Sequence, residues 1–228
     1  RDTRKSRGLG DLYKRQFSVM ATTGTLKVLE KQRNANYHKQ INKPHHYKVK
    51  FVDYDIDLEV SPTRSSAHFK LSSGTQKKLN IIIDAFFKGS SVEINSEKNT
   101  IYGISKNNSG GVPENFSNYF IIEFKTPFNS YGTWNGSGEL FKNDKLNGEH
   151  VGAYVSYDSI TDGAIEFTVS SSFISHEQAL INLNREIPAD QSFEATKLNA
   201  KKIWNNELSK IKITPSNEAD EINRFDNM

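Results

Sequence analysis

The chain of 228 residues contains no cysteine. This absence excludes disulfide bonds, thiolate catalysis and zinc sites built on cysteine, and it leaves the cellular compartment open. The sequence also lacks any apolar run approaching the roughly 18 residues of a membrane-spanning helix. Its formal net charge of +3 is too small to argue for nucleic acid. We therefore expect neither a nucleic-acid partner nor a membrane-spanning segment.

The composition is that of a folded domain. Hydrophobic residues make up 35% of the chain and charged residues 25%, so a real core can form. The basic N-terminal stretch, residues 1–17, has no apolar segment of the kind found in a secretion signal. Because the chain begins with Arg1, we expect any such signal to lie upstream. Export, a cell-envelope position and a cytoplasmic position all stay open.

Alternating apolar residues predict strands along most of the chain. The clearest alternation runs over Tyr47–Val60, and its change of parity near Phe51 predicts a bulge or a bend. The apolar run within Lys78–Gly89 is typical of a central strand buried on both faces. Asn118–Phe128 predicts another buried strand. Many strands joined by short polar turns predict a mainly β fold, an antiparallel β-sandwich.

Turn signals divide the remaining strands. Residues 17–31 predict a hairpin with Gly24 at its turn, and residues 91–106 predict a second hairpin that turns at Glu97–Asn99. Residues 33–46 are polar and irregular. Two late strands, within residues 150–158 and 163–174, are separated by a strong Asp-Gly turn signal.

The pattern changes from strand to helix at Ser175. Ser175 is a candidate N-cap with Gln178 in the position of a capping box, and Ser192 is a second candidate N-cap. We expect helices over residues 175–186 and 192–211, and hence a sandwich domain over residues 1–174 and a helical linker over residues 175–228. The apolar faces of these helices would pack on the sandwich or on a following domain: Leu180, Leu183, Ala200 and Trp204.

Candidate metal ligands in the sequence have simpler explanations. Four acidic residues alternate along one stretch: Asp53, Asp55, Asp57 and Glu59. Calcium needs converging oxygen ligands, whereas alternate carboxylates on a strand stand roughly 7 Å apart, so a solvated polar face is favoured. Neighbouring His45 and His46 point apart on an extended chain and favour a surface loop. We predict no metal site in this chain.

One aromatic residue is a candidate sugar-binding group. Trp134 stands in the stretch "SYGTWNGSG", which predicts a flexible loop that exposes the ring. A tryptophan ring can stack on the apolar face of a sugar, with Asn135 and Ser137 as hydrogen-bonding neighbours. The alternative is that Trp134 only caps the end of the sandwich. No nucleophile-elbow motif is present.

The order of several stretches resembles a known family. These are "RGLGDLYKRQFSVMATTG", "HHYKVKF", "IIIDAFFKG", "FTVSSSFISHEQALINLNREIP" and "FEATKLNAKKIWNNELSKIKI". Together they resemble the N-terminal β-sandwich domain of glycoside hydrolase family 92, the bacterial α-mannosidases. The resemblance covers nearly the whole chain and implies a supersandwich of the galactose-mutarotase type.

The resemblance also implies a function. The parent enzyme would be a calcium-dependent, inverting exo-α-mannosidase that acts on mannose-containing glycans. Its catalytic carboxylates, and most ligands of its calcium, would lie in an (α/α)6-barrel domain after the end of this chain, so no catalytic residue is expected here. The alternative is a stand-alone carbohydrate-binding module without hydrolase activity.

Within this chain, the resemblance implies a substrate-binding role for Ser6, Arg7 and Gly8. They match the family's Ser-Gly-Arg/Thr-Gly loop, although the spacing of "SRGLGD" differs. With Trp134 they are the predicted substrate-binding residues.

Overall fold

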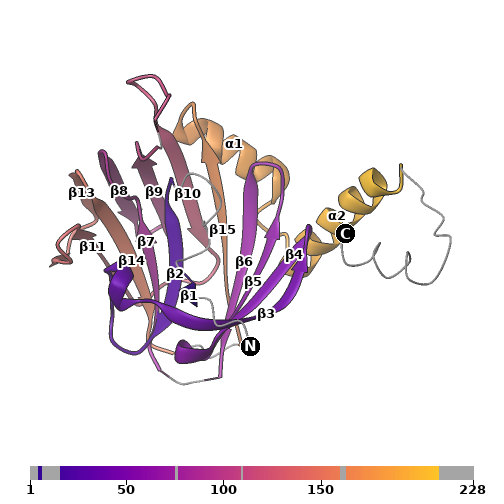
Figure 1. The fold of residues 1–228 in the computed structure, drawn as a ribbon, viewed down its shortest axis with the longest axis horizontal. Helices are drawn as coiled ribbons and strands as arrows, with labels where there is room; N and C mark the ends of the chain where they lie inside the picture. The colour runs from indigo at the N-terminus through magenta and orange to yellow at the C-terminus, as the bar shows by residue number, and fades with distance from the viewer. Residues whose placement is uncertain (1–4, 7–15, 75–76, 109, 160–162, 211–228) are drawn as a thin grey trace.

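The computed structural model describes residues 5–6, 16–74, 77–108, 110–159 and 163–210. They form two stacked antiparallel sheets with two helices on one outer face (Figure 1). The predicted antiparallel β-sandwich is confirmed. No helix among these residues is long and apolar enough to cross a membrane.

Among the described residues, the larger sheet, called the large sheet below, has ten strands. In spatial order they are β1 (Lys5–Ser6), β3 (Ala35–Lys43), β4 (His46–Phe51), β5 (Ile56–Pro62), β6 (Ser66–Ser73), β15 (Ile165–Ser172), β10 (Asn118–Phe124), β9 (Thr100–Ser105), β8 (Ser90–Asn95) and β13 (Lys145–Gly148). The second-last strand in space, β8, forms the predicted hairpin with β9.

The small sheet, in the part of the chain that the structure describes, has five strands. In spatial order they are β12 (Leu140–Phe141), β11 (Ser130–Asn135), β14 (Val151–Tyr157), β7 (Leu79–Asp84) and β2 (Ser18–Thr23). Every residue of β7 is buried, as the continuous apolar run predicted. One face of β7 belongs to the core between the sheets, and its other face is covered from outside.

The core lies between the two sheets and is almost entirely apolar. Ile81 and Ile83 of the small sheet and Phe120 and Ile122 of the large sheet are all 0% exposed. Burial of a side chain of this size contributes about 1.5–3 kcal/mol. The Phe120 ring also stacks on Phe17, with ring centroids 4.2 Å apart.

Two local predictions need correction. Residues 17–31 do not form a hairpin, because β2 pairs with β7 and the chain leaves β2 through Gly24, at φ 83°, into a loop and a 3-10 helix, η1 (Glu30–Gln32). The polar stretch 33–46 contains β3, a largely exposed strand. The late strands β14 and β15 lie in different sheets, so the chain passes from the small sheet to the large sheet between them.

The bend predicted near Phe51 is a helical turn. The 3-10 helix η2 (Val52–Tyr54) separates β4 from β5, and Asp55 follows it in the left-handed region at φ 50°. The acidic side chains around this turn have partners, which supports the predicted polar face. Lys50 Nζ lies 2.5 Å from Asp55 Oδ1 and 3.5 Å from Asp57 Oδ2.

Both helices begin at the predicted caps. α1 (His176–Glu186) starts after Ser175, whose Oγ accepts from Gln178 N at 3.2 Å, and α2 (Phe193–Leu208) starts after Ser192, whose Oγ accepts from Ala195 N at 3.2 Å. The Gln178 side chain bonds to Asn182 instead of returning to the cap, so only half of the capping box forms.

The helices lie on the outer face of the large sheet. α1 packs on β15 and β10, whereas α2 touches β5 and β6 only with its first half and then extends away from the sandwich (Figure 1). Leu183 and Ala200 are buried, as expected for residues that pack on the sandwich. Trp204, by contrast, is 41% exposed and Ile203 is 66% exposed. The second half of α2 thus carries uncovered apolar side chains.

Candidate functional site

Trp134 lies on β11 and is completely buried. The prediction of an exposed ring in a flexible loop is therefore wrong. The reason is its cross-strand partner, Gly152 on β14, where an added Cβ would come 2.2 Å from Trp134 Cε2. The glycine leaves room for the ring to lie against the sheet, and the indole Nε1 donates to the Ala153 carbonyl at 3.3 Å.

A segment distant in sequence covers this ring. Residues 24–33, called the covering loop, follow β2 and cross the outer face of the small sheet. Val28 packs with Ile82 and Trp134 in a small apolar cluster. The Arg33 guanidinium lies 5.8 Å from the Trp134 ring centroid, a cation–π contact, and its Nη1 donates to the Val28 carbonyl at 2.8 Å.

Asp84, at the end of β7, is the centre of a buried polar cluster. Its Oδ2 accepts from Arg33 Nη2 at 2.8 Å, and its Oδ1 lies 2.8 Å from His150 Nε2. Oδ1 also accepts from the Phe86 backbone N–H at 3.0 Å. Asp84 is 2% exposed and Arg33 is 5% exposed. A buried carboxylate with this many partners is satisfied, and removing any one of them would be costly.

The loop after Asp84 holds an unusual backbone. Phe86 and Lys88 adopt left-handed conformations, at φ 59° and 69°, which cost about 1–3 kcal/mol each for such residues. Hydrogen bonds fix the loop: Ser105 Oγ donates to the Ala85 carbonyl at 2.7 Å and Ser90 Oγ to the Phe86 carbonyl at 3.0 Å. The result is a rigid turn.

This rigid turn exposes an aromatic residue. Phe87 is 55% exposed, and its ring centroid lies 4.2 Å from that of His150. His150 in turn contacts Asp84 and Trp134. A chain of contacts therefore runs from the buried cluster to the surface. The sequence signal for it was weak, because Arg33, Asp84 and His150 are far apart along the chain.

The other predicted substrate-binding residues lie elsewhere. Ser6 belongs to β1, where it pairs with Ala35 at the edge of the large sheet, whereas Trp134 belongs to the small sheet. Arg7 and Gly8 lie outside the described residues. The structure thus places Ser6 and Trp134 on different sheets.

A second cluster attaches α2 to the large sheet. The His68 side chain is 0% exposed, and its Nδ1 lies 2.9 Å from Thr196 Oγ1 in the first turn of α2. Burial, with a smaller effect of Lys125, lowers the His68 pKa to about 4, so the imidazole is neutral near pH 7. The Phe193 ring packs edge-on against His68, with ring centroids 5.5 Å apart.

The end of α1 is attached to the turn between β5 and β6. Glu186 Oε2 accepts from Thr63 Oγ1 at 2.7 Å and from Ser65 N at 2.8 Å. Partial burial raises the Glu186 pKa, but these hydrogen bonds outweigh it and hold the pKa below its ordinary value. Beside them, a groove of about 790 Å³ runs along α2, with Ile203 and Trp204 in its wall.

The acidic and histidine side chains of the described residues do not gather into a metal-binding group. In the parts of the chain that the structure covers, no group of three or more His, Asp or Glu side chains could hold a metal ion. His46, predicted in a surface loop, is buried at the start of β4, where its Nε2 lies 2.7 Å from Glu59 Oε2. Asp53 Oδ2 accepts from Asn36 N at 2.8 Å. These acidic and histidine side chains therefore serve contacts within the fold.

Two family models match the chain. The N-terminal domain of glycosyl hydrolase family 92 matches residues 3–172, and the catalytic domain of the same family matches residues 178–226. The chain belongs to glycoside hydrolase family 92. The catalytic-domain match begins within α1 and includes α2, so the two helices of this family 92 chain are similar to part of that domain. No curated protein sequence matches the chain.

Solved structures of family 92 enzymes have the same fold. An inverting mannosidase of the family from Bacteroides thetaiotaomicron is 33% identical, with a TM-score of 0.82 over 88% of this chain and 27% of that one. An α-mannosidase of the family from the same organism, solved with mannoimidazole, is 19% identical, with a TM-score of 0.79 over 90% of this chain and 29% of that one. This chain therefore spans less than a third of the length of these enzymes.

The fold extends beyond the family. A bacterial glucoamylase solved with acarbose is 10% identical, with a TM-score of 0.58 over 86% of this chain and 32% of that one. At this identity the likeness concerns the sandwich fold alone.

Proposed function

We propose that this family 92 chain is the N-terminal, non-catalytic sandwich domain of an exo-α-mannosidase, which removes α-linked mannose from glycans. The observation that carries the proposal is the 33% identity to an inverting mannosidase over 88% of this chain. The burial of Trp134 removes the support that an exposed ring would have given to a stand-alone carbohydrate-binding module.

The role of the sandwich in this proposal is to hold the beginning of the catalytic domain. The match to the family's catalytic domain covers α1 and α2, and both helices are attached through buried or half-buried polar contacts at Glu186 and His68. The uncovered Ile203 and Trp204 on the second half of α2 suit contact with the rest of an (α/α)6 barrel.

The chemistry would belong to the catalytic domain. In an inverting glycosidase, one carboxylic acid protonates the leaving oxygen while a carboxylate activates water on the opposite face of the sugar. We assign the acid and the base to the barrel by resemblance to the family. We assign the calcium ligands mainly to the barrel, since no group of three or more His, Asp or Glu side chains among the described residues could hold a metal ion.

The test uses the protein expressed from its complete reading frame. We expect it to release mannose from p-nitrophenyl α-mannoside and from α-linked mannobiose, and we expect proton NMR to detect β-mannose as the first product. A chelator should abolish the activity and added calcium should restore it. A folded full-length protein that releases no mannose from any α-mannoside would contradict the proposal. Initial formation of α-mannose would contradict inversion, and activity that survives chelation would contradict the calcium assignment.

A further inference from the structure

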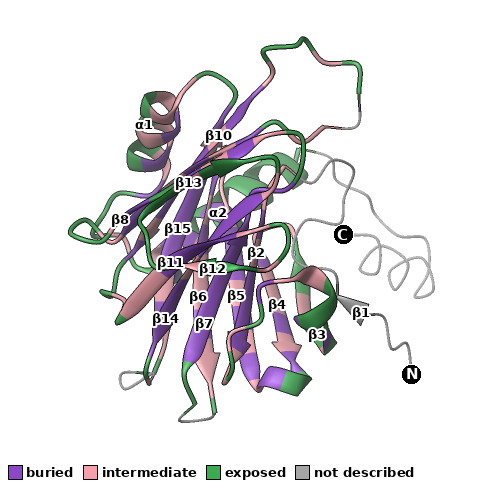
Figure 2. Ribbon diagram, turned by 90° about the vertical axis from the view of Figure 1, so that its left-hand side faces the viewer, coloured by how far each residue is buried: buried purple, intermediate pink, exposed green. Residues whose placement is uncertain are grey.

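The outer face of the small sheet contains an open cleft beside the covering loop. Its volume is about 860 Å³, within the range of small-ligand sites of about 300–1,000 Å³. β7 and β14 form its floor, and its rims are residues 24–26 of the covering loop, residues 129–131 at the start of β11 and residues 142–144 between β12 and β13. Figure 2 shows these strands from the side on which the covering loop lies.

Tyr154 supplies an aromatic surface in this cleft. It lies opposite Gly132 on β11, where an added Cβ would come 2.6 Å from the Tyr154 Oη and 2.9 Å from its Cζ. The ring therefore crosses over the glycine and lies along the sheet. Tyr154 is half-buried, so part of this ring remains accessible. The face of an aromatic ring carries negative potential, which suits the C–H groups on the apolar side of a sugar.

The floor of the cleft is polar and rigid. Asn80 is 0% exposed, and both ends of its amide have partners: Oδ1 accepts from Ser156 Oγ at 2.7 Å, and Nδ2 donates to the Gly24 carbonyl at 3.0 Å. The Gly24 bond also ties the covering loop to the floor. A fixed floor lowers the entropy that a ligand must overcome when it binds.

The rim adds hydrogen-bonding groups of both kinds. Thr133 Oγ1 donates to Asn143 Oδ1, which orients the amide of Asn143 in the cleft wall. Lys78 Nζ donates to Ser130 Oγ at 3.2 Å. Lys142 and Asp144, of opposite charge, stand on either side of Asn143 and are exposed. Asp158, 3.9 Å from Lys78, and Asp144 offset the two lysines of the cleft, Lys78 and Lys142. This mixture of amides, hydroxyls and charges of both signs suits an uncharged polyhydroxylated ligand better than a phosphate or a nucleic acid.

We infer that this cleft binds a mannose-containing oligosaccharide, with Tyr154 as the surface on which a sugar ring stacks. An uncharged oligosaccharide follows from the cleft itself, whereas mannose as its sugar rests on the proposed function.

The test is photo-crosslinking of the full-length protein with a hydrolysis-resistant, thio-linked α-mannotriose that carries a diazirine. Mass spectrometry of proteolytic peptides then maps the labelled residues. We expect label on peptides that contain residues 129–131, 142–144 or 154–156. Tyr154→Leu should lower this labelling about tenfold, which corresponds to about 1.4 kcal/mol. Tyr154→Phe keeps the ring and should lower it only about threefold, the loss of one neutral hydrogen bond.

Two lysine variants test whether misfolding explains the lower labelling of Tyr154→Leu. Lys142→Glu changes an exposed rim residue and should also weaken labelling of the cleft, whereas Lys31→Glu, on the exposed η1 helix, should not. Label found only outside the cleft peptides, or cleft labelling unchanged in Tyr154→Leu, would overturn the inference. If the cleft is labelled but the protein hydrolyses no α-mannoside, the inference stands and the proposed activity is overturned. If the protein hydrolyses α-mannosides but the cleft is not labelled, the proposed activity stands and the inference is overturned.

Discussion

On the outer face of the small sheet, two aromatic residues occupy equivalent positions on neighbouring strands. Trp134 on β11 lies over Gly152, and Tyr154 on β14 lies over Gly132. The covering loop closes over Trp134, which is completely buried, and leaves Tyr154 half-buried at the edge of an open cleft. The same cross-strand arrangement therefore gives a fully buried ring on one half of the face. On the other half it gives a half-buried ring that packs against the Val28–Ile82–Trp134 cluster and also borders the cleft.

The charged groups of the two halves differ in the same way. The Arg33–Asp84 pair, 2.8 Å apart, is almost fully buried under the covering loop, whereas Lys78 and Asp158 beside the cleft are 3.9 Å apart and largely exposed. An exposed pair of this kind contributes little to stability. A buried pair becomes expensive when one partner is removed, because the other charge stays desolvated. On this face, a charged group has a structural role when the covering loop buries it, and it is free to contact a ligand when the covering loop leaves it exposed. Residue type matters less than this position.

The largest expected effect comes from truncating the two rings. Trp134→Ala should lower the free energy of unfolding by about 3–5 kcal/mol, the usual cost of deleting a buried large aromatic side chain. Tyr154→Ala should cost about 1–2 kcal/mol, since the ring is already partly in water. Chemical denaturation of both variants measures the difference. Equal losses of unfolding free energy in the two variants would show that Trp134 and Tyr154 are packed alike. The contrast between the two halves of this face would then be wrong.

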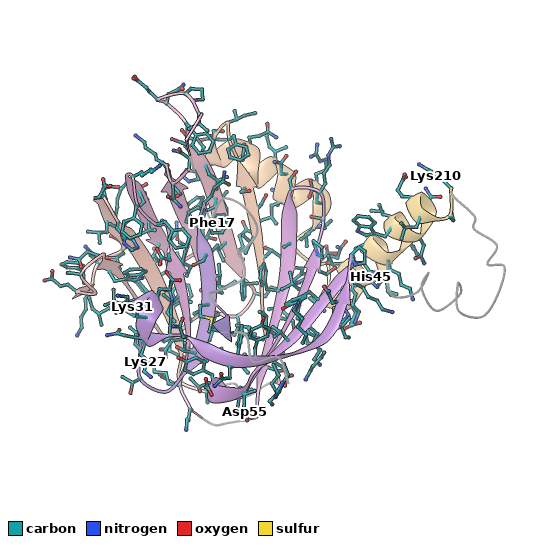
Figure 3. The ribbon with its side chains drawn as sticks, in the orientation of Figure 1. Phe17, Lys27, Lys31, His45, Asp55 and Lys210 are labelled. Atoms are coloured by element: carbon teal, nitrogen blue, oxygen red, sulfur yellow. The ribbon has the colours of Figure 1, made fainter. Side chains whose placement is uncertain are left out.

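The second-largest expected effect comes from removing the buried cation, the Arg33 guanidinium. Arg33→Met should destabilise the protein by about 3 kcal/mol, because Asp84 then keeps its buried charge with His150 and one backbone N–H as its remaining partners among these contacts. The matched control is Lys27→Met, on the exposed part of the same loop (Figure 3), which should change stability by less than about 0.5 kcal/mol. A control as destabilised as Arg33→Met would place the effect in the loop and not in the ion pair.

The smallest effect concerns a buried polar group on the opposite face of the sandwich. The His68 pKa is about 4 in the folded protein and 6.5 for the ordinary side chain, so the unfolded chain binds the extra proton between these values. The contribution of neutral His68 to the free energy of unfolding is fully present above pH 6.5, and it is lost as the pH falls towards 4. Lys125 contributes to this lowering of the pKa, and the Glu166 carboxylate lies 3.3 Å from Nε2.

We expect the free energy of unfolding of the wild type to fall by about 1–3 kcal/mol across this window. His68→Gln removes the titrating group, so its stability should vary less with pH over the same range. Denaturation series at several pH values test this. Parallel pH profiles for the two proteins would exclude His68 as the source.

Local signals predicted the helices, and the reason is that helix caps are local. Ser175 and Ser192 each satisfy a backbone N–H three residues ahead, so their neighbours in sequence are also their partners in space. The same holds for the hairpin of β8 and β9. Elements of this kind can be recognised without knowledge of the rest of the fold.

Elements whose partners are distant in sequence escaped prediction. β3 is polar because it is mostly exposed, and within the described part of the chain its outer edge pairs with the short β1 alone. It therefore lacks the apolar alternation of a covered strand. Gly24 signals a turn correctly, but the partner of β2 is β7, about 60 residues further on. Trp134 is the plainest case, since its glycine-rich neighbourhood indicates a loop, and the segment that buries it precedes it by about 100 residues.

The position of β15 has a consequence for the order of events during synthesis. This strand, the last in sequence among the described residues, lies in the middle of the large sheet, between β6 and β10. Until Ser172 has emerged from the ribosome, the strands on its two sides form separate ribbons with unpaired edges that can associate wrongly. The large sheet closes only when nearly the whole domain is available. A nascent chain stopped before β15 should therefore be far more vulnerable to proteases and aggregation than one stopped after it.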